Sequence, residues 1–149
     1  MRAVVQRVTE AAVSVDQKVV GAIARGVLVY LGVAPGDTVS DRQYIAGKIR
    51  DLRIFDDEAG RMNVSLADVR GSVLLVSQFT LYADTTRGRR PGFSGAAPPD
   101  VARAEYDAMA SELRSHGLHV ETGVFQAHMA VQAVNDGPVT ILIDSTKPL

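Results

Sequence analysis

Residues 131–143 read Val-Gln-Ala-Val-Asn-Asp-Gly-Pro-Val-Thr-Ile-Leu-Ile, two runs rich in β-branched residues with a Gly-Pro step between them. The runs at 131–134 and 139–143 each predict a buried strand, and Asp136-Gly137 is typical of a tight hairpin turn. Pro138 starts the second run without an N–H to donate, which leaves the main chain at Gly137 able to contact something other than a neighbouring strand. Two interpretations follow: a plain hairpin turn, or a main-chain recognition loop that includes a cis peptide bond.

Further strands and two helices are predicted around this stretch. Four short apolar or alternating runs open the chain and predict an antiparallel meander at residues 2–8, 11–15, 18–23 and 26–33. Ser40, with Gln43 three residues later, predicts the capping box of a helix that ends near Arg53. Residues 100–115 predict a second helix, whose apolar face carries Ala102, Tyr106, Met109 and Leu113.

The remaining strands are expected at residues 72–76, 118–124 and 127–134. We therefore expect an α/β fold with two main helices, in which a mostly antiparallel sheet of about eight strands curves like a β-barrel. Since no linker or internal repeat interrupts the chain, residues 1–149 are expected to form a single domain.

Composition narrows the class of protein. With 46% hydrophobic and 22% charged residues, the chain resembles soluble globular proteins. The absence of cysteine excludes thiol nucleophiles, disulfides and thiolate metal sites. Arg2, Gln6 and Arg7 interrupt the first apolar run, which predicts neither a signal peptide nor a membrane span; we expect a cytoplasmic protein without a membrane partner. The net charge of −1 argues against non-specific nucleic-acid binding, DNA included, so any such contact must come from a local patch.

Two segments after residue 76 carry candidate functional side chains. If the strand at 72–76 continues through Ser77-Gln78-Phe79-Thr80-Leu81, Gln78 and Thr80 stand together on one face. The segment 84–99 is too long for a tight turn, and loops of this length are usually functional or disordered. It contains Arg87-Gly88-Arg89-Arg90-Pro91-Gly92-Phe93, for which a solvated loop and a phosphate or RNA contact both remain open.

Familiar catalytic patterns are missing from the sequence. His116, His119 and His128 lack the spacing and acidic partner of a metal site or a triad, so structural or solvated roles are expected for them. Neither a Walker loop nor a Gly-x-Ser-x-Gly elbow occurs. The remaining candidates include no strong general base. An enzyme built on them must act on a substrate that is already activated, by positioning and main-chain donors.

Five motifs, in order along the chain, resemble those of the D-aminoacyl-tRNA deacylase family, also called D-tyrosyl-tRNA deacylases. The two signature motifs are Ser77-Gln78-Phe79-Thr80-Leu81 and Asn135-Asp136-Gly137-Pro138-Val139-Thr140. The other three are the opening strand at 1–8, the segments 52–55 and 60–63, and the basic loop with Arg87-Gly88 and Arg90-Pro91. The resemblance covers essentially the whole chain.

This resemblance implies an enzyme that hydrolyses the ester of D-aminoacyl-tRNA, and also mischarged glycyl-tRNA, as chirality proofreading in translation quality control. It implies a homodimer that binds the acceptor end of tRNA and uses neither a cofactor nor a metal. The implied catalytic residues are Gln78, Phe79 and Thr80. The implied substrate-binding residues are Ser77, Gly137, Pro138, Arg7 and Met129.

In this family the Gly137-Pro138 pair is implied to be cis and to reach into the partner subunit's site, where its main chain rejects L-amino acids. Arg7 is implied to hold that corner. Two mechanisms stay open: attack by an oriented water, helped by the substrate's 2′-hydroxyl and by main-chain N–H groups near Phe79 and Thr80, and covalent attack by Thr80.

The sequence departs from the family pattern at Gly92 and Tyr82, both near the implied site. The alternative function is a catalytically inactive tRNA-binding module of the same fold. Its mark would be loss of Gln78, Thr80 or the Gly-Pro pair, and this chain keeps all of them.

Overall fold

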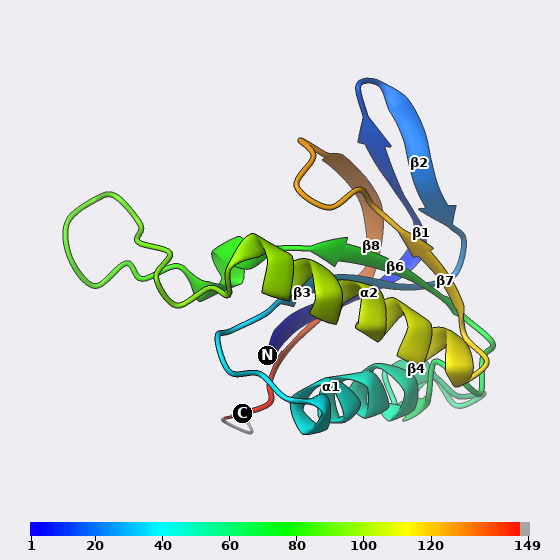
Figure 1. Cartoon of the computed structure of the whole chain (residues 1–149). Helices are drawn as coiled ribbons and strands as arrows, with labels where there is room; N and C mark the ends of the chain where they lie inside the picture. Colours follow the sequence, from blue (N-terminus) through cyan, green and yellow to red (C-terminus); the bar gives the residue numbers. More distant parts are fainter. Residues whose placement is uncertain (147–149) are drawn as a thin grey trace.

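The computed structural model describes residues 1–146, which form a curved mixed sheet with two helices packed against it (Figure 1). The helices are α1 (Val39–Asp51) and α2 (Pro99–Ser115). The strands of the main sheet are β1 (Arg2–Val15), β2 (Lys18–Ile23), β3 (Gly26–Gly32), β6 (Ser72–Ser77), β7 (His119–Thr122) and β8 (Ala130–Asp144). The short strands β4 (Phe55–Asp56) and β5 (Met62–Val64) pair with each other.

Strand β1 organises the antiparallel half of the sheet. It pairs with β8 from Arg2 to Ser14, with β3 through its first half and with β2 through its second half. The connection to β2 turns at Asp16 and Gln17, which both have positive φ. The other half of the sheet is parallel, because β6 pairs in parallel with both β3 and β7. The α/β fold class with a barrel-like sheet is confirmed, and the sheet is mixed.

Both faces of the central strands are buried, as the alternation of their side chains requires. Val27, Val29, Val73 and Leu75 pack in the core beneath the helices. Leu28, Leu74 and Val76 point the other way, into a second hydrophobic cluster with side chains from β1 and β2. The mostly apolar sequence of β6 is thereby explained.

The second helix matches its prediction closely, since Ala102, Tyr106, Met109 and Leu113 are all buried. The capping box of α1 was predicted at the wrong residues. Thr38 is the N-cap, its side chain accepts from the Asp41 amide, and the Asp41 carboxylate accepts from the Thr38 amide. The predicted runs at 2–8 and 11–15 are one strand, β1, rather than two strands of a meander.

Within residues 1–146, no helix combines the length and the apolar character needed to cross a membrane.

Candidate functional site

The segment after β6 leaves the sheet abruptly. The strand ends at Ser77, and residues Phe79–Tyr82 form a short 3₁₀ helix, η1, so the strand does not continue to Leu81. The Gln78 amide donates to the Leu31 carbonyl (2.8 Å) as the chain passes close over β3. A Cβ at Gly32 would lie 3.1 Å from the Gln78 carbonyl oxygen, so only glycine gives this close passage without displacing it.

The 3₁₀ turn still brings Gln78 and Thr80 together. The Gln78 side-chain amide donates to the Thr80 hydroxyl oxygen. Because the turn begins at Phe79, the amides of Phe79 and Thr80 precede its first internal hydrogen bonds. Two main-chain donors and two polar side chains thus stand at the end of a buried strand.

This strand end borders a cavity of about 750 Å³ that is built mainly from apolar side chains. Its walls come from β3, the end of β6, η1, the loop before α2, the start of α2, the turn before β8 and β8 itself. The large side chains among them are Tyr30, Phe79, Phe93, Phe125 and Met129. Its polar residues are Ser77, Gln78 and Gln126. A cavity of this size lies in the range typical of sites that bind small molecules or small parts of larger ones.

The electrostatics of the cavity are those of a neutral site. Tyr30 is the one lining residue with a titratable side chain, and burial raises the pKa of its hydroxyl. No carboxylate, imidazole or amine lines the cavity. The residues that line the cavity therefore offer no carboxylate, imidazole or amine that could act as a general base.

The Gly-Pro corner is not a hairpin turn. Residues 131–134 and 139–143 belong to one strand, β8, which runs antiparallel to β1 on both sides of the corner. Asn135 pairs with Val8 and Thr140 pairs with Gln6, so the four residues 136–139 bulge out opposite Arg7 alone. The peptide bond between Gly137 and Pro138 is cis, as the second interpretation predicted.

Arg7, on the neighbouring strand β1, holds this corner by hydrogen bonding. Its guanidinium is buried and donates from Nη1 to the Ile54 carbonyl (2.8 Å) and from Nε to the Asp136 carbonyl (3.2 Å). The carboxylates of Asp56 and Asp136 lie 3.4 and 3.3 Å away. Gly137 has φ of 122°, and a Cβ there would lie 3.1 Å from Arg7 Nη2 and 3.0 Å from Val139 Cγ2. This position accepts only glycine without displacing its neighbours.

The predicted site residues thus fall into two groups within one chain. Ser77, Gln78, Phe79 and Met129 line the cavity, with Thr80 adjacent in η1. Gly137 and Pro138 belong to the corner and Arg7 holds it from β1, and none of these three lines the cavity.

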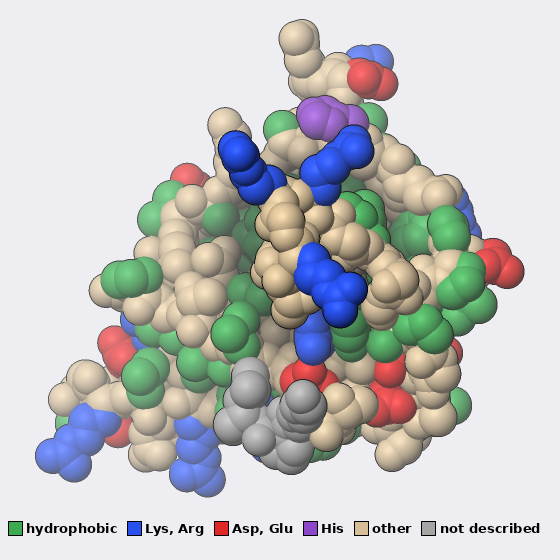
Figure 2. Space-filling view, turned by 90° about the vertical axis from the view of Figure 1, so that its left-hand side faces the viewer, with side chains coloured by type: hydrophobic (Ala, Val, Ile, Leu, Met, Phe, Trp, Pro, Cys, Tyr) green, Lys and Arg blue, Asp and Glu red, His purple; other side chains and the backbone are tan. Residues whose placement is uncertain are grey.

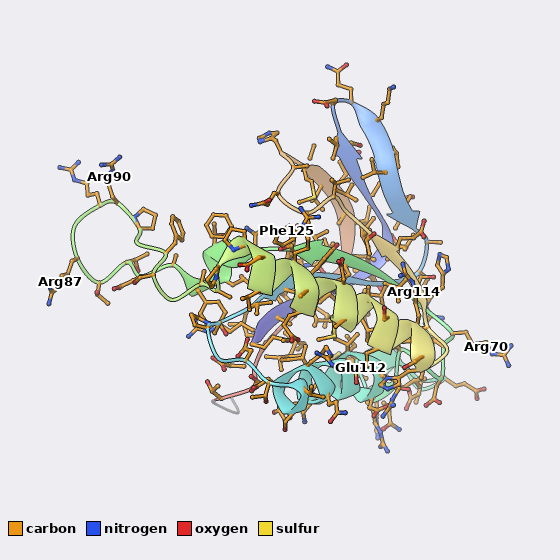
Figure 3. All side chains as sticks on the ribbon, in the orientation of Figure 1. Arg70, Arg87, Arg90, Glu112, Arg114 and Phe125 are labelled. Carbon is orange, nitrogen blue, oxygen red and sulfur yellow. The ribbon has the colours of Figure 1, made fainter. Side chains whose placement is uncertain are left out.

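Several residues that line the cavity were not predicted from the sequence. Phe125 lies over α2, with its ring 6.0 Å from that of Tyr106 (Figure 3). Gln126 has a positive φ, which is uncommon outside glycine. Tyr30 lies in β3, a mostly apolar strand, and no local pattern in the sequence marked it or the residues near Phe125 as lining a cavity.

None of the three histidines lines the cavity. His116 caps the end of α2, His128 is exposed, and His119 Nε2 lies 3.7 Å from the Glu121 carboxylate. In the described part of the chain, no three His, Cys, Asp or Glu side chains gather in a way that could hold a metal ion.

The two departures from the family pattern have simple structural settings. A Cβ at Gly92 would meet nothing within 4 Å, so this position tolerates a side chain. The Arg2 guanidinium lies 4.5 Å above the ring of Tyr82, and burial raises the pKa of the Tyr82 hydroxyl. Neither residue lines the cavity.

The sequence and the structure are both similar to those of known proteins. The sequence model of the D-Tyr-tRNA(Tyr) deacylase family matches residues 4–144. A protein of Thermotoga petrophila named D-aminoacyl-tRNA deacylase is 59% identical over 147 residues, which cover 99% of each chain. One of the same name from Desulforamulus reducens is 57% identical over 147 residues, with the same coverage.

The solved structure titled "c-Myc DNA Unwinding Element Binding Protein" matches with a TM-score of 0.91 and 40% identity, over 97% of this chain and 98% of that one.

Proposed function

The chain belongs to the D-Tyr-tRNA(Tyr) deacylase family, and on that premise we propose that it hydrolyses the ester bond of D-aminoacyl-tRNA, releasing tRNA and the free D-amino acid. The observation that carries the proposal is the similarity of this chain to two proteins named D-aminoacyl-tRNA deacylase. They are 57% and 59% identical to it over 99% of its length. The neutral cavity beside η1 supports it, because an aminoacyl ester is reactive enough to need no charged base. The test is release of the amino acid from D-tyrosyl-tRNA by the purified protein.

The residues around the strand end supply a coherent chemical route. The substrate ester lies beside η1, where the amides of Phe79 and Thr80 donate to the oxygen that gains charge as water attacks. The substrate's own 2′-hydroxyl orients that water. Gln78 holds Thr80 by its side-chain amide, and Met129 and Phe79 enclose the amino acid.

Thr80 serves in this route as a positioning group and not as the nucleophile. Its hydroxyl oxygen accepts from an amide, and the cavity walls offer no base that would take its proton. Replacing Thr80 with alanine removes about one hydrogen bond, so the rate of D-tyrosyl-tRNA hydrolysis should fall by roughly fivefold and stay measurable. Single-turnover kinetics measures this. Complete loss of hydrolysis, with a normal fold and normal tRNA binding, would instead identify Thr80 as the nucleophile.

We further propose that two copies of the chain associate so that the corner of each reaches the cavity of the other. Two observations support this arrangement: the corner and the cavity are separate within one chain, and β8 pairs only with β1 among the described residues. Val134 and Leu142 are also large, exposed apolar residues on that strand. A long, apolar edge strand is a surface that folded proteins normally cover.

This arrangement predicts a dimer under assay conditions. Light scattering at micromolar concentration should give twice the mass of one chain, and activity per chain should fall on dilution into the monomeric range. A monomer with full activity would show that the corner does not act across subunits.

In the dimer, the corner acts as a chirality filter. A wall of main-chain atoms at Gly137-Pro138 excludes the side chain of any L-amino acid, whatever its chemistry, while a D-side chain points away from it. Glycine has no side chain to exclude, so glycyl-tRNA is also a substrate. We place this proofreading in the cytoplasm, where aminoacyl-tRNA is made.

A further inference from the structure

The segment between η1 and α2 projects far from the body of the molecule (Figure 1, green loop at the far left). Its neck is closed by two backbone hydrogen bonds, from the Asp84 amide to the Gly92 carbonyl (2.7 Å) and from the Gly92 amide to the Asp84 carbonyl (2.9 Å). The Asp84 carboxylate accepts from the amide and the hydroxyl of Thr86. The loop is therefore shaped by its own hydrogen bonds.

Three arginines occupy the tip of this loop, at positions 87, 89 and 90. All three are exposed, and Figure 3 shows Arg87 and Arg90 pointing outward from the ribbon. Within residues 1–146, none of the three forms an ion pair with a carboxylate. Seen from the side on which the loop projects, basic side chains stand out over the middle of the face (Figure 2).

The tip of the loop is linked to the cavity through Phe93. Phe93, next to the neck, lines the cavity, and its ring packs edge-on against that of Phe79 with centroids 5.0 Å apart. From Phe93 the chain reaches Arg90 within about 10 Å and Arg87 within about 20 Å if it is extended. With a terminal adenosine seated in the cavity, the tip is therefore within reach of phosphates one to a few nucleotides further along the RNA.

We infer that Arg87, Arg89 and Arg90 bind backbone phosphates of the tRNA acceptor end while its aminoacylated terminus occupies the cavity. The inference rests on the proposed function for the identity of the RNA. Three unpaired guanidinium groups on a protein of net charge −1 form the local patch that RNA binding requires. Arginine presents donors that match phosphate oxygens, and these contacts fix the register of the RNA without reading its sequence.

The phosphate contacts should act on binding of the long substrate and not on the chemistry at the ester. We compare the triple variant Arg87→Gln, Arg89→Gln, Arg90→Gln with a control of equal charge change, Lys18→Gln, Lys48→Gln, Arg70→Gln. The control residues are exposed and do not line the cavity, and Arg70 lies at the opposite end of the molecule (Figure 3). The substrates are D-tyrosyl-tRNA and D-tyrosyl-adenosine, which has no phosphates.

For the loop variant we expect KM for D-tyrosyl-tRNA to rise about tenfold at low salt, with kcat unchanged. The slope of log KM against log salt should decrease by about 2, from three lost contacts to single-stranded phosphates. Hydrolysis of D-tyrosyl-adenosine should stay at the wild-type rate, and the control variant should behave as wild type with both substrates.

An unchanged KM and salt slope in the loop variant would overturn the inference, and so would an equal rise of KM in both triple variants. Binding of uncharged tRNA, measured by fluorescence anisotropy, separates this inference from the proposed function. If the wild-type protein hydrolyses neither substrate, the proposed function fails. Weaker tRNA binding by the loop variant alone would then still support the phosphate contacts, and equal binding by all three proteins would refute them.

Discussion

Replacing Gly137 with alanine is expected to lower kcat/KM for D-tyrosyl-tRNA about 100-fold, the usual cost of moving a positioning group by about 1 Å. The added Cβ lies 3.1 Å from Arg7 Nη2 and 3.0 Å from Val139 Cγ2, and the backbone has φ of 122°. Because a residue with a side chain rarely adopts φ of 122°, and because Arg7 is also held by the Ile54 carbonyl outside the corner, we expect the corner itself to shift. Steady-state kinetics with D- and L-tyrosyl-tRNA measures the effect, and the ratio of D to L hydrolysis should fall at least tenfold.

Gly36→Ala is the matched control for this variant. Gly36 also has positive φ, 81°, but an added Cβ meets nothing within 4 Å. Both variants should lose about 1–3 kcal/mol of unfolding free energy from backbone strain, while Gly36→Ala keeps wild-type activity. An active Gly137→Ala protein with an unchanged D to L ratio would show that the corner does not touch the substrate.

Replacing Arg7 with lysine should have the second largest effect, because one ammonium cannot serve both carbonyls that the guanidinium bridges. Leaving the buried Ile54 carbonyl without its partner costs about 1–3 kcal/mol of unfolding free energy. The corner also loses its anchor at Asp136, so the ratio of D to L hydrolysis should fall. Urea unfolding and the two tyrosyl-tRNA substrates provide the measurements.

Arg42→Lys gives the comparison. Arg42 lies on α1, away from the corner, and its guanidinium pairs with Glu105 (2.7 Å) and Glu112 (3.4 Å). Its replacement should also lower stability but leave discrimination intact. If Arg7→Lys and Arg42→Lys both discriminate as wild type does, Arg7 only stabilises the fold.

Periodicity in the sequence predicted those elements whose burial is set locally. The face of α2 and the buried strand β6 are examples, because 3.6-residue spacing marks the buried face of a helix and a short continuous apolar run is typical of a strand buried on both faces. The capping box of α1 was misplaced by two residues because Thr38-x-x-Asp41 and Ser40-x-x-Gln43 overlap in sequence. Which of the two boxes forms depends on the residue at which the preceding loop ends and the helix begins.

The path of the chain at Ser77–Leu81 and the joining of residues 131–134 and 139–143 into one strand could not be predicted, for a common reason. Each depends on a partner distant in sequence: Gly32 gives room for the chain after Ser77 to turn, and Arg7 fills the space beneath residues 136–139. A local pattern cannot show either neighbour. Asp136-Gly137 accordingly looked like a hairpin, although both flanking runs pair with the same strand and run in the same direction.

The central claim is that this chain hydrolyses D-aminoacyl-tRNA and excludes L-amino acids by main-chain atoms alone. The most direct test measures kcat/KM for D-tyrosyl-tRNA, L-tyrosyl-tRNA and glycyl-tRNA with one enzyme preparation. We expect rapid release of D-tyrosine and glycine, and release of L-tyrosine at the spontaneous rate. Release of none of the three would contradict the assignment, and equal release of D- and L-tyrosine would contradict the main-chain filter.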